Sequence, residues 1–226
     1  MNLLIMGPPG AGKGTQAEII SNKLGVKHLS SGDMLRSAVA IQSDLGKRAE
    51  SYMKAGELVP DELMIQMILS EVQSVLESST YDGFLLDGFP RTVVQAKALD
   101  ESFDENGVRI DRIISLDVDA EEVVQRLTSR RVCGECKSIF TVNQLPSTES
   151  DICPSCGAQA LVKRKDDEEQ VIRNRLEVYS KSTFPILSYY SEVHSILNID
   201  GSQEKDTITD FILGELVNTS SRVAEV

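Results

Sequence analysis

A glycine-rich loop near the N-terminus limits the possible folds of this 226-residue chain more than any other feature. Residues 7–13 follow a short apolar run and precede residues 15–24, whose apolar side chains have helical spacing. Glycines let successive backbone N–H groups turn toward one anion, and a helix N-terminus and Lys13 add positive charge. Because strand, loop, lysine and helix come in this order, the segment predicts a phosphate-binding loop rather than an ordinary turn.

The rest of the chain continues the alternation of strands and helices. Residues 3–6 are a short apolar run typical of a buried strand, residues 27–29, 83–86, 109–116 and 195–199 are further strand candidates, and helical patterns lie between them. This alternation predicts an α/β fold with a five-stranded parallel sheet flanked by helices. The pattern stops between residues 129 and 165, where Cys, Gly, Pro and Ser are frequent, so we expect a small inserted domain there.

Polar residues at expected strand ends are candidates for a binding site. Asp87 ends a predicted strand, and Arg91 follows four positions later. Ligands of open α/β sheets bind at the carboxyl ends of strands, where a carboxylate can hold hydrated Mg²⁺ and an arginine can bind phosphate. Lys13 is followed by Gly14 rather than the usual Ser or Thr, with Thr15 one place later, so we expect Mg²⁺ to depend on other groups. A turn aspartate beside a surface arginine is the alternative.

Further arginines flank the inserted segment. Arg126 and Arg130 would share one side of a helix over residues 120–130, if the helix extends that far. Downstream, helical spacing places Arg175 beside an apolar stripe and Arg173 toward solvent. Clustered cations of this kind predict an anionic partner, and a solvated basic face is the alternative.

Four cysteines form two C-x2-C pairs separated by sixteen residues: Cys133, Cys136, Cys153 and Cys156. This spacing is typical of a tetrahedral four-thiolate zinc site without an open position, which indicates a structural role. Because the segment is too small and polar to build its own core, we expect the metal to supply folding energy. Free thiols, or two disulfides in an oxidising compartment, are the alternatives.

The acidic composition argues against a general nucleic-acid-binding surface. The chain has 23 Lys and Arg against 35 Asp and Glu, a net charge of −12, so its cations can bind phosphate only where they are concentrated. No apolar run approaches the roughly 18 residues of a membrane span, and the first apolar run is too short for a signal peptide. We therefore expect a cytoplasmic protein that binds neither nucleic acid nor membrane.

Several motifs together resemble the adenylate kinase family. They are, in order, residues 7–16 (GPPGAGKGTQ), 31–36 (SGDMLR), 87–91 (DGFPR), 130–131 (RR) and 164–167 (RKDD). The likeness runs from residue 1 to about residue 201, and it looks like the long bacterial form whose lid carries a cysteine cluster. It implies a monomeric transferase of nucleotide biosynthesis that interconverts ATP plus AMP with two ADP, with Mg²⁺. Phosphoryl transfer depends on positioning and charge neutralisation, so we expect direct in-line transfer without a covalent intermediate.

The resemblance also implies a division of the chain into functional segments. A P-loop core would comprise residues 1–29, 60–128 and 166–226. A helical AMP-binding segment would cover residues 30–59, and a zinc-ribbon-like lid would cover residues 129–165. The lid would close over the nucleotides and exclude water.

Matching positions imply roles for individual residues. The residues implied in catalysis are Lys13, Asp87, Arg91, Arg130, Arg164 and Arg175. Those implied in holding ATP are Gly10, Ala11, Gly12, Lys13, Gly14, Thr15, Arg126, Arg130, Ile139, Phe140 and Gln203. Those implied in holding AMP are Ser31, Arg36, Glu57, Leu58, Val59, Gly88, Phe89, Pro90, Arg91, Gln95, Arg164 and Arg175. Ser31 replaces the threonine common in the family, which keeps the hydroxyl but leaves the base preference less secure.

Two other interpretations stay open from the sequence alone. One is a kinase for another nucleotide or a small metabolite, which activity with AMP, GMP, CMP and UMP would separate from an AMP kinase. The other is a zinc-ribbon nucleic-acid binder that uses ATP as a switch. Glu135, Glu149 and Asp151 lie in the ribbon and argue against the basic face that such a binder needs.

Overall fold

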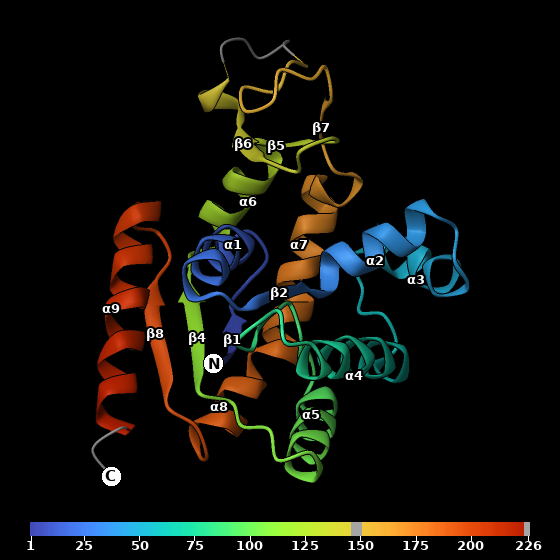
Figure 1. Ribbon diagram of the computed structural model, residues 1–226. Coiled ribbons are helices and arrows are strands. Elements are labelled where there is room, and N and C mark those ends of the chain that lie inside the picture. Colours follow the sequence, from blue (N-terminus) through green and yellow to red (C-terminus); the bar gives the residue numbers. More distant parts are fainter. Residues whose placement is uncertain (146–150, 224–226) are drawn as a thin grey trace.

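The computed structural model describes residues 1–145 and 151–223, and Glu149 of the ribbon lies outside them. A five-stranded parallel sheet forms its centre (Figure 1). The strands are β1 (Asn2–Met6), β2 (Lys27–Ser30), β3 (Phe84–Asp87), β4 (Arg112–Asp117) and β8 (Ile196–Asp200). Their spatial order is β2-β3-β1-β4-β8, which confirms the predicted parallel sheet.

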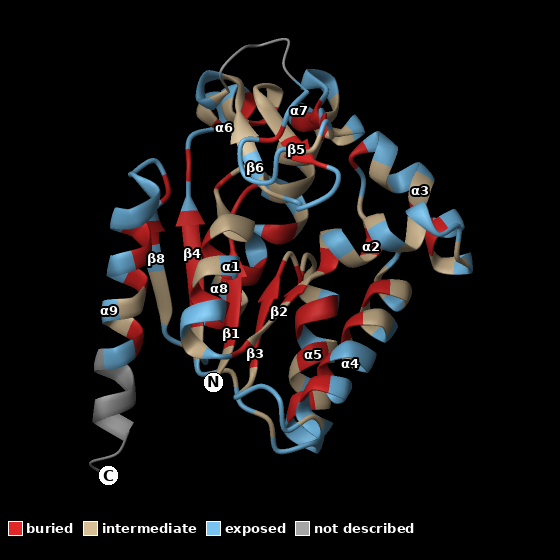
Figure 2. Cartoon of the chain, turned by 45° about the horizontal axis from the view of Figure 1, so that its top comes forward, coloured by how far each residue is buried: buried red, intermediate tan, exposed pale blue. Residues whose placement is uncertain are grey.

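Helices cover both faces of this sheet. Successive side chains of a strand point to opposite faces, and apolar side chains lie on both. In β1, Leu4 and Met6 belong to one buried cluster, and Leu3 and Ile5 to the other. The first face is covered by α4 (Asp61–Glu77), α5 (Val93–Glu105) and α8 (Pro185–Ser191). The second face is covered by α1 (Lys13–Leu24), α6 (Ala120–Thr128), α7 (Glu169–Val178) and α9 (Lys205–Val223). Strands β1, β3 and β4 are accordingly buried over nearly their whole length, whereas the outer strands β2 and β8 are only partly buried (Figure 2).

Two segments extend from the core near the end toward which the strands point (Figure 1). Residues 30–59 contain α2 (Ser31–Ala40) and α3 (Asp44–Ala55). Residues 129–165 contain an antiparallel sheet of order β6-β5-β7 and a short 3-10 turn, η1 (Val142–Gln144), and a second 3-10 turn, η2 (Lys165–Asp167), begins where they end. The strands of this sheet are β5 (Arg130–Cys133), β6 (Ile139–Thr141) and β7 (Leu161–Val162).

Several element boundaries differ from the sequence expectation. The helix expected over residues 120–130 ends at Thr128, because the backbone of Arg130 pairs with Thr141 in β5–β6. Helix α7 continues through a π-helical turn, η3 (Tyr179–Thr183), into α8, and the apolar periodicity gave no sign of that turn. Within residues 1–145 and 151–223, no helix combines the length and hydropathy that crossing a bilayer requires.

Candidate active site

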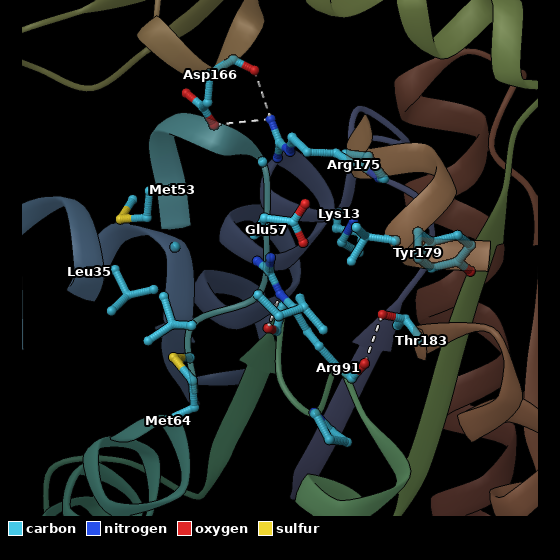
Figure 3. Close-up of a pocket in the computed structure, with 18 of the residues that line it drawn as sticks. Lys13, Leu35, Met53, Glu57, Met64, Arg91, Asp166, Arg175, Tyr179 and Thr183 are labelled. Carbon is cyan, nitrogen blue, oxygen red and sulfur yellow. Dashed lines mark hydrogen bonds and ion pairs between the residues drawn. The ribbon is translucent and has the colours of Figure 1, made fainter. Parts of the chain in front are cut away.

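One pocket lies at the carboxyl end of the sheet and is lined by several separate parts of the chain (Figure 3). These parts are the loop after β1, helix α2, the end of α3 and the turn after it, α4, the loop after β3, η2, and α7 with η3. Of the residues implied from the sequence, those lining this pocket are Lys13, Arg36, Glu57, Leu58, Val59, Gly88, Pro90, Arg91, Gln95 and Arg175. The strand register makes this convergence possible, because Ile5 and Ser30 both lie level with Asp87.

The loop after β1 is shaped as the glycine pattern predicts. Gly7 has a φ of 142°, and a Cβ there would lie 2.4 Å from the carbonyl oxygen of Leu116. Gly12 caps the N-terminus of α1 and offers no side-chain oxygen to the first N–H groups of the helix. Those N–H groups and the positive end of the helix dipole can therefore bind an anion.

Lys13 folds back over this loop and faces the pocket. Its Nζ donates hydrogen bonds to the carbonyl oxygens of Gly7 and Pro8, at 2.8 Å and 2.7 Å. Burial lowers the pKa of Lys13 to about 8, against the favourable charge of Asp87, and nearby Arg91 lowers it further. A bound polyanion therefore stabilises the charged form of this ammonium group, which is held among other cations and away from water.

Hydrogen bonds hold the backbone and Nε of Arg91, whereas its terminal nitrogens face the pocket. Its backbone N–H donates to Oε1 of Gln95 at 2.7 Å, and its Nε donates to the carbonyl oxygen of Gly88 at 2.7 Å. Burial, followed by the charge of Arg175, lowers the pKa of Arg91 to about 10, so the guanidinium is still cationic at neutral pH. The terminal nitrogens are directed into the pocket, where they can bind phosphate oxygens (Figure 3).

Two aspartates hold Arg130 and Arg175, a role that we did not predict for them. Asp167 is fully buried and receives two hydrogen bonds from Arg130, at 2.8 Å and 2.6 Å. Asp166 lies 3.0 Å from Nη1 of Arg175. Both lie in η2 and pair with arginines. The run of acids beside Arg164 was the available signal.

The direction of Arg175 agrees with the sequence expectation, as does that of Arg173. Arg175 lines the pocket and its side chain is 21% exposed, whereas the side chain of Arg173 is 45% exposed and pairs with Glu121 and Glu169. Burial and the nearby Arg36 lower the pKa of Arg164 to about 10. These guanidiniums make the site a concentrated patch of positive charge on an acidic protein.

Other implied residues lie outside this pocket. Arg126 lies on α6, where it pairs with Glu122, whereas Arg130 lies in β5. The two arginines expected on one helix are therefore on different elements. Ile139 lies in β6 and is 43% exposed, and Phe140 packs against the buried Cys133 and Cys153. The remaining implied residues that do not line the pocket are Gly10, Ala11, Gly12, Gly14, Thr15, Ser31, Asp87, Phe89, Arg130, Arg164 and Gln203.

Some of these residues still adjoin the site. Ser31 is buried, and its hydroxyl donates to the carbonyl oxygen of Gly88 at 2.7 Å. The side chain of Phe89 packs in the core, so a ligand can meet only its backbone. Gly201 packs near the carbonyl oxygen of Ala11, which places the loop before Gln203 beside the glycine-rich loop.

Comparison with known proteins decides the family of this site. The family model described as "Adenylate kinase" matches residues 5–195. The chain belongs to the adenylate kinase family. It is 43% identical over 212 residues to an adenylate kinase of Clostridium tetani, with 94% of this chain and 96% of the relative covered. It is 45% identical to that of Carboxydothermus hydrogenoformans, covering 92% and 95%, and 45% identical to that of Archaeoglobus fulgidus, covering 90% and 92%.

This adenylate kinase is accordingly a nucleoside monophosphate kinase, a transferase, as the motifs implied. The alternative of a nucleic-acid switch is not supported, because the family match includes the ribbon and the phosphate loop in one enzyme. Both the fold class and the family predicted from the sequence are confirmed.

The four cysteines of this adenylate kinase are arranged as a metal site. Their Sγ atoms all lie within 4.8 Å of one another. The Sγ atoms of Cys133 and Cys156 are 3.7 Å apart, and those of Cys136 and Cys153 are 3.6 Å apart. A tetrahedron of thiolates around zinc has an S–S separation of about 3.8 Å for bonds of ~2.3 Å. The donor set and spacing therefore fit a structural zinc ion.

Asp87 has the chemistry that Mg²⁺ requires. Its carboxylate oxygen Oδ2 lies 3.4 Å from Nε2 of His28 and 3.5 Å from where a Cβ on Gly14 would be. This places a hard oxygen ligand directly beside the start of α1, where phosphates are expected to bind.

Proposed function

We propose that this adenylate kinase catalyses ATP + AMP = 2 ADP by direct transfer of the γ-phosphoryl group in the pocket at the carboxyl end of the sheet. The observation that best supports this proposal is that Lys13, Arg91 and Arg175 line one cavity although they come from distant parts of the chain. A loosely bonded phosphoryl group in transfer needs in-line positioning and cationic groups around its oxygens, and no nucleophilic side chain.

ATP occupies the side of the pocket formed by the loop after β1. Gly10–Thr15 backbone N–H groups bind its β- and γ-phosphates, and Lys13 leaves its carbonyl partners to bind phosphate oxygens. Arg126 and Arg130, with Ile139, Phe140 and Gln203, complete the ATP side when the lid closes. The placement of Gly201 near Ala11 supports the assignment of Gln203.

AMP occupies the opposite side, lined by the turn after α3 and the loop after β3. Residues 57–59 and Gln95 surround its base, whereas Arg36 and Arg91 bind its phosphate. Arg164 and Arg175 then bridge the two phosphates. The lining of the pocket supports this assignment of the AMP side, because residues 57–59 and Gln95 line the same pocket as Arg36 and Arg91.

The two extending segments act as separate moving parts in this scheme. Residues 30–59 form the AMP-binding segment and residues 129–165 the lid, on a core of residues 1–29, 60–128 and 166–226. Closing of the lid brings Arg130 and Arg164 to the phosphates and excludes water, which would otherwise accept the phosphoryl group.

Two metals serve different purposes. Asp87 would hold the water ligands of the Mg²⁺ that accompanies ATP, and that ion would supply neutralisation of phosphate charge. Zn²⁺ is held by Cys133, Cys136, Cys153 and Cys156 and links the two turns of the lid, one ion per chain. We propose further that the enzyme is a cytoplasmic monomer whose reaction balances the adenine nucleotides, without nucleic-acid or membrane partners.

A coupled ADP assay with the purified chain tests the proposal. With ATP present, AMP should be the best acceptor among AMP, GMP, CMP and UMP, and a lower rate with AMP than with any of these would exclude the assignment. Arg91→Ala should lower kcat by about 10²- to 10⁴-fold, because it removes one cationic contact to the transition state. Arg173→Ala, on α7 but facing solvent, is the matched control and should leave turnover unchanged. Equal activity of the two variants would remove Arg91 from the site.

A further inference from the structure

The helix that carries Arg175 widens into a π-helical turn just where it passes the pocket. In η3 the backbone N–H of Phe184 donates to the carbonyl oxygen of Tyr179, five residues earlier, at 2.9 Å. Pro185 explains the position of this turn. It cannot donate an N–H, and its ring crowds the carbonyl four residues before it, so a regular helix cannot pass through it unchanged.

The wider turn directs Thr183 into the pocket. Arg175, Tyr179 and Thr183 are four residues apart, and all three line the cavity (Figure 3). In a regular α-helix, successive steps of four residues rotate progressively away from one line. Because a π-turn rotates less per residue, it brings Thr183 back toward the face that carries Arg175.

Thr183 uses its hydroxyl on Arg91 rather than on its own helix. Its side chain is buried, and Oγ1 donates to the carbonyl oxygen of Arg91 at 2.9 Å. Helical threonines commonly bond to a carbonyl of the preceding turn instead. Residue 91 is therefore held on both sides of its backbone, with its N–H on Gln95 and its carbonyl on Thr183.

We propose that Thr183 is a positioning residue for phosphoryl transfer. Its hydroxyl joins the helix that carries Arg175 to the loop that carries Arg91, and so fixes the separation of two guanidiniums that bind the phosphates. The hydrogen bond from Arg91 Nε to Gly88 completes this arrangement and leaves only the terminal nitrogens for the ligand. The inference rests on the proposed role of Arg91. A small displacement of a positioned group can cost far more in rate than in stability.

A double-mutant cycle separates positioning from general support of the fold. Thr183→Val removes the hydroxyl and keeps the shape, and it should lower kcat by about 5- to 50-fold. Thr183→Ser keeps the hydroxyl and should restore kcat to within about twofold of the parent enzyme. In the Arg91→Ala background, Thr183→Val should change kcat by less than about twofold, because the group that it positions is gone.

The control is Thr209→Val, which removes another buried hydroxyl. Thr209 lies in α9, and its hydroxyl contacts Gln16 of α1 and Lys205 of its own helix. The effect of Thr209→Val on kcat should be the same with and without Arg91→Ala. If Thr183→Val fails to fold, Thr183→Ala removes the same hydroxyl without bulk and takes its place in the cycle.

Two outcomes would overturn the inference: equal losses from Thr183→Val with and without Arg91, or a Thr183→Ser variant as impaired as Thr183→Val. The proposed function fails separately, if Arg91→Ala alone leaves turnover intact.

Discussion

Replacing Asp167 with asparagine tests how Arg130 is held. Asp167 is fully buried, and it accepts two hydrogen bonds from Arg130, whose side chain is 14% exposed. Asparagine has nearly the same shape but no charge, and its NH₂ group would face one of the donors of Arg130. Removing one partner of a buried ion pair costs about 3–5 kcal/mol, and the partial exposure of Arg130 together with one retained hydrogen bond reduces this to roughly 2–4 kcal/mol.

Thermal unfolding followed by circular dichroism measures this loss. For a chain of this size the expected decrease in Tm is about 5–15 °C. Glu121→Gln is the matched control, because Glu121 makes a similar two-point contact with Arg173 at an exposed position. Water and salt screen that pair, so its loss should not measurably change Tm. Equal decreases in Tm for the two variants would refute the conclusion that burial gives the Arg130–Asp167 pair its importance.

Other consequences concern the glycine-rich loop, the cysteine cluster and the turn after α3. Because burial lowers the pKa of Lys13 to about 8, kcat/KM for ATP should fall as the pH rises through that value, and a profile flat to about pH 9.5 would contradict this role. The unliganded enzyme should instead gain stability between pH 8 and 10.5, where the unfolded chain keeps a proton that folded Lys13 has lost. Cys133→Ser should reduce bound zinc and Tm more than kcat at low temperature, whereas an unchanged Tm with and without a chelator would argue against a structural metal. Gly56→Ala should cost roughly 1–3 kcal/mol and raise KM for AMP, because φ is 76° and a Cβ would lie 2.9 Å from Cγ of Arg175; an unchanged KM for AMP would contradict the close packing of this turn on α7.

The core was predictable because its signals are local. The central strands β1, β3 and β4 each contain a short apolar run, and the loop of residues 7–13 combines glycines with a lysine and a following helix. Parallel pairing then places the ends of these strands at one edge, so Asp87 and the loop could be expected to meet. The cysteine spacing was equally local, and the four Sγ atoms do gather in one place.

Features that depend on tertiary contacts were not predictable. The end of α6 at Thr128 is set by the pairing of Arg130 with a strand eleven residues later, which helical periodicity does not encode. The partnership of Arg130 with Asp167 joins residues 37 positions apart. Thr183 looks like an ordinary helical residue in sequence, and only the π-turn before Pro185 directs it to Arg91.

A crystal structure of this enzyme with a bisubstrate mimic, in which ATP and AMP are joined through their phosphates, tests the central claim most directly. We predict that Lys13, Arg91 and Arg175 each contact the polyphosphate chain, with one adenosine beside residues 57–59. A complex in which Lys13 and Arg91 contact different molecules of the mimic, or in which the polyphosphate lies outside this pocket, would contradict the account.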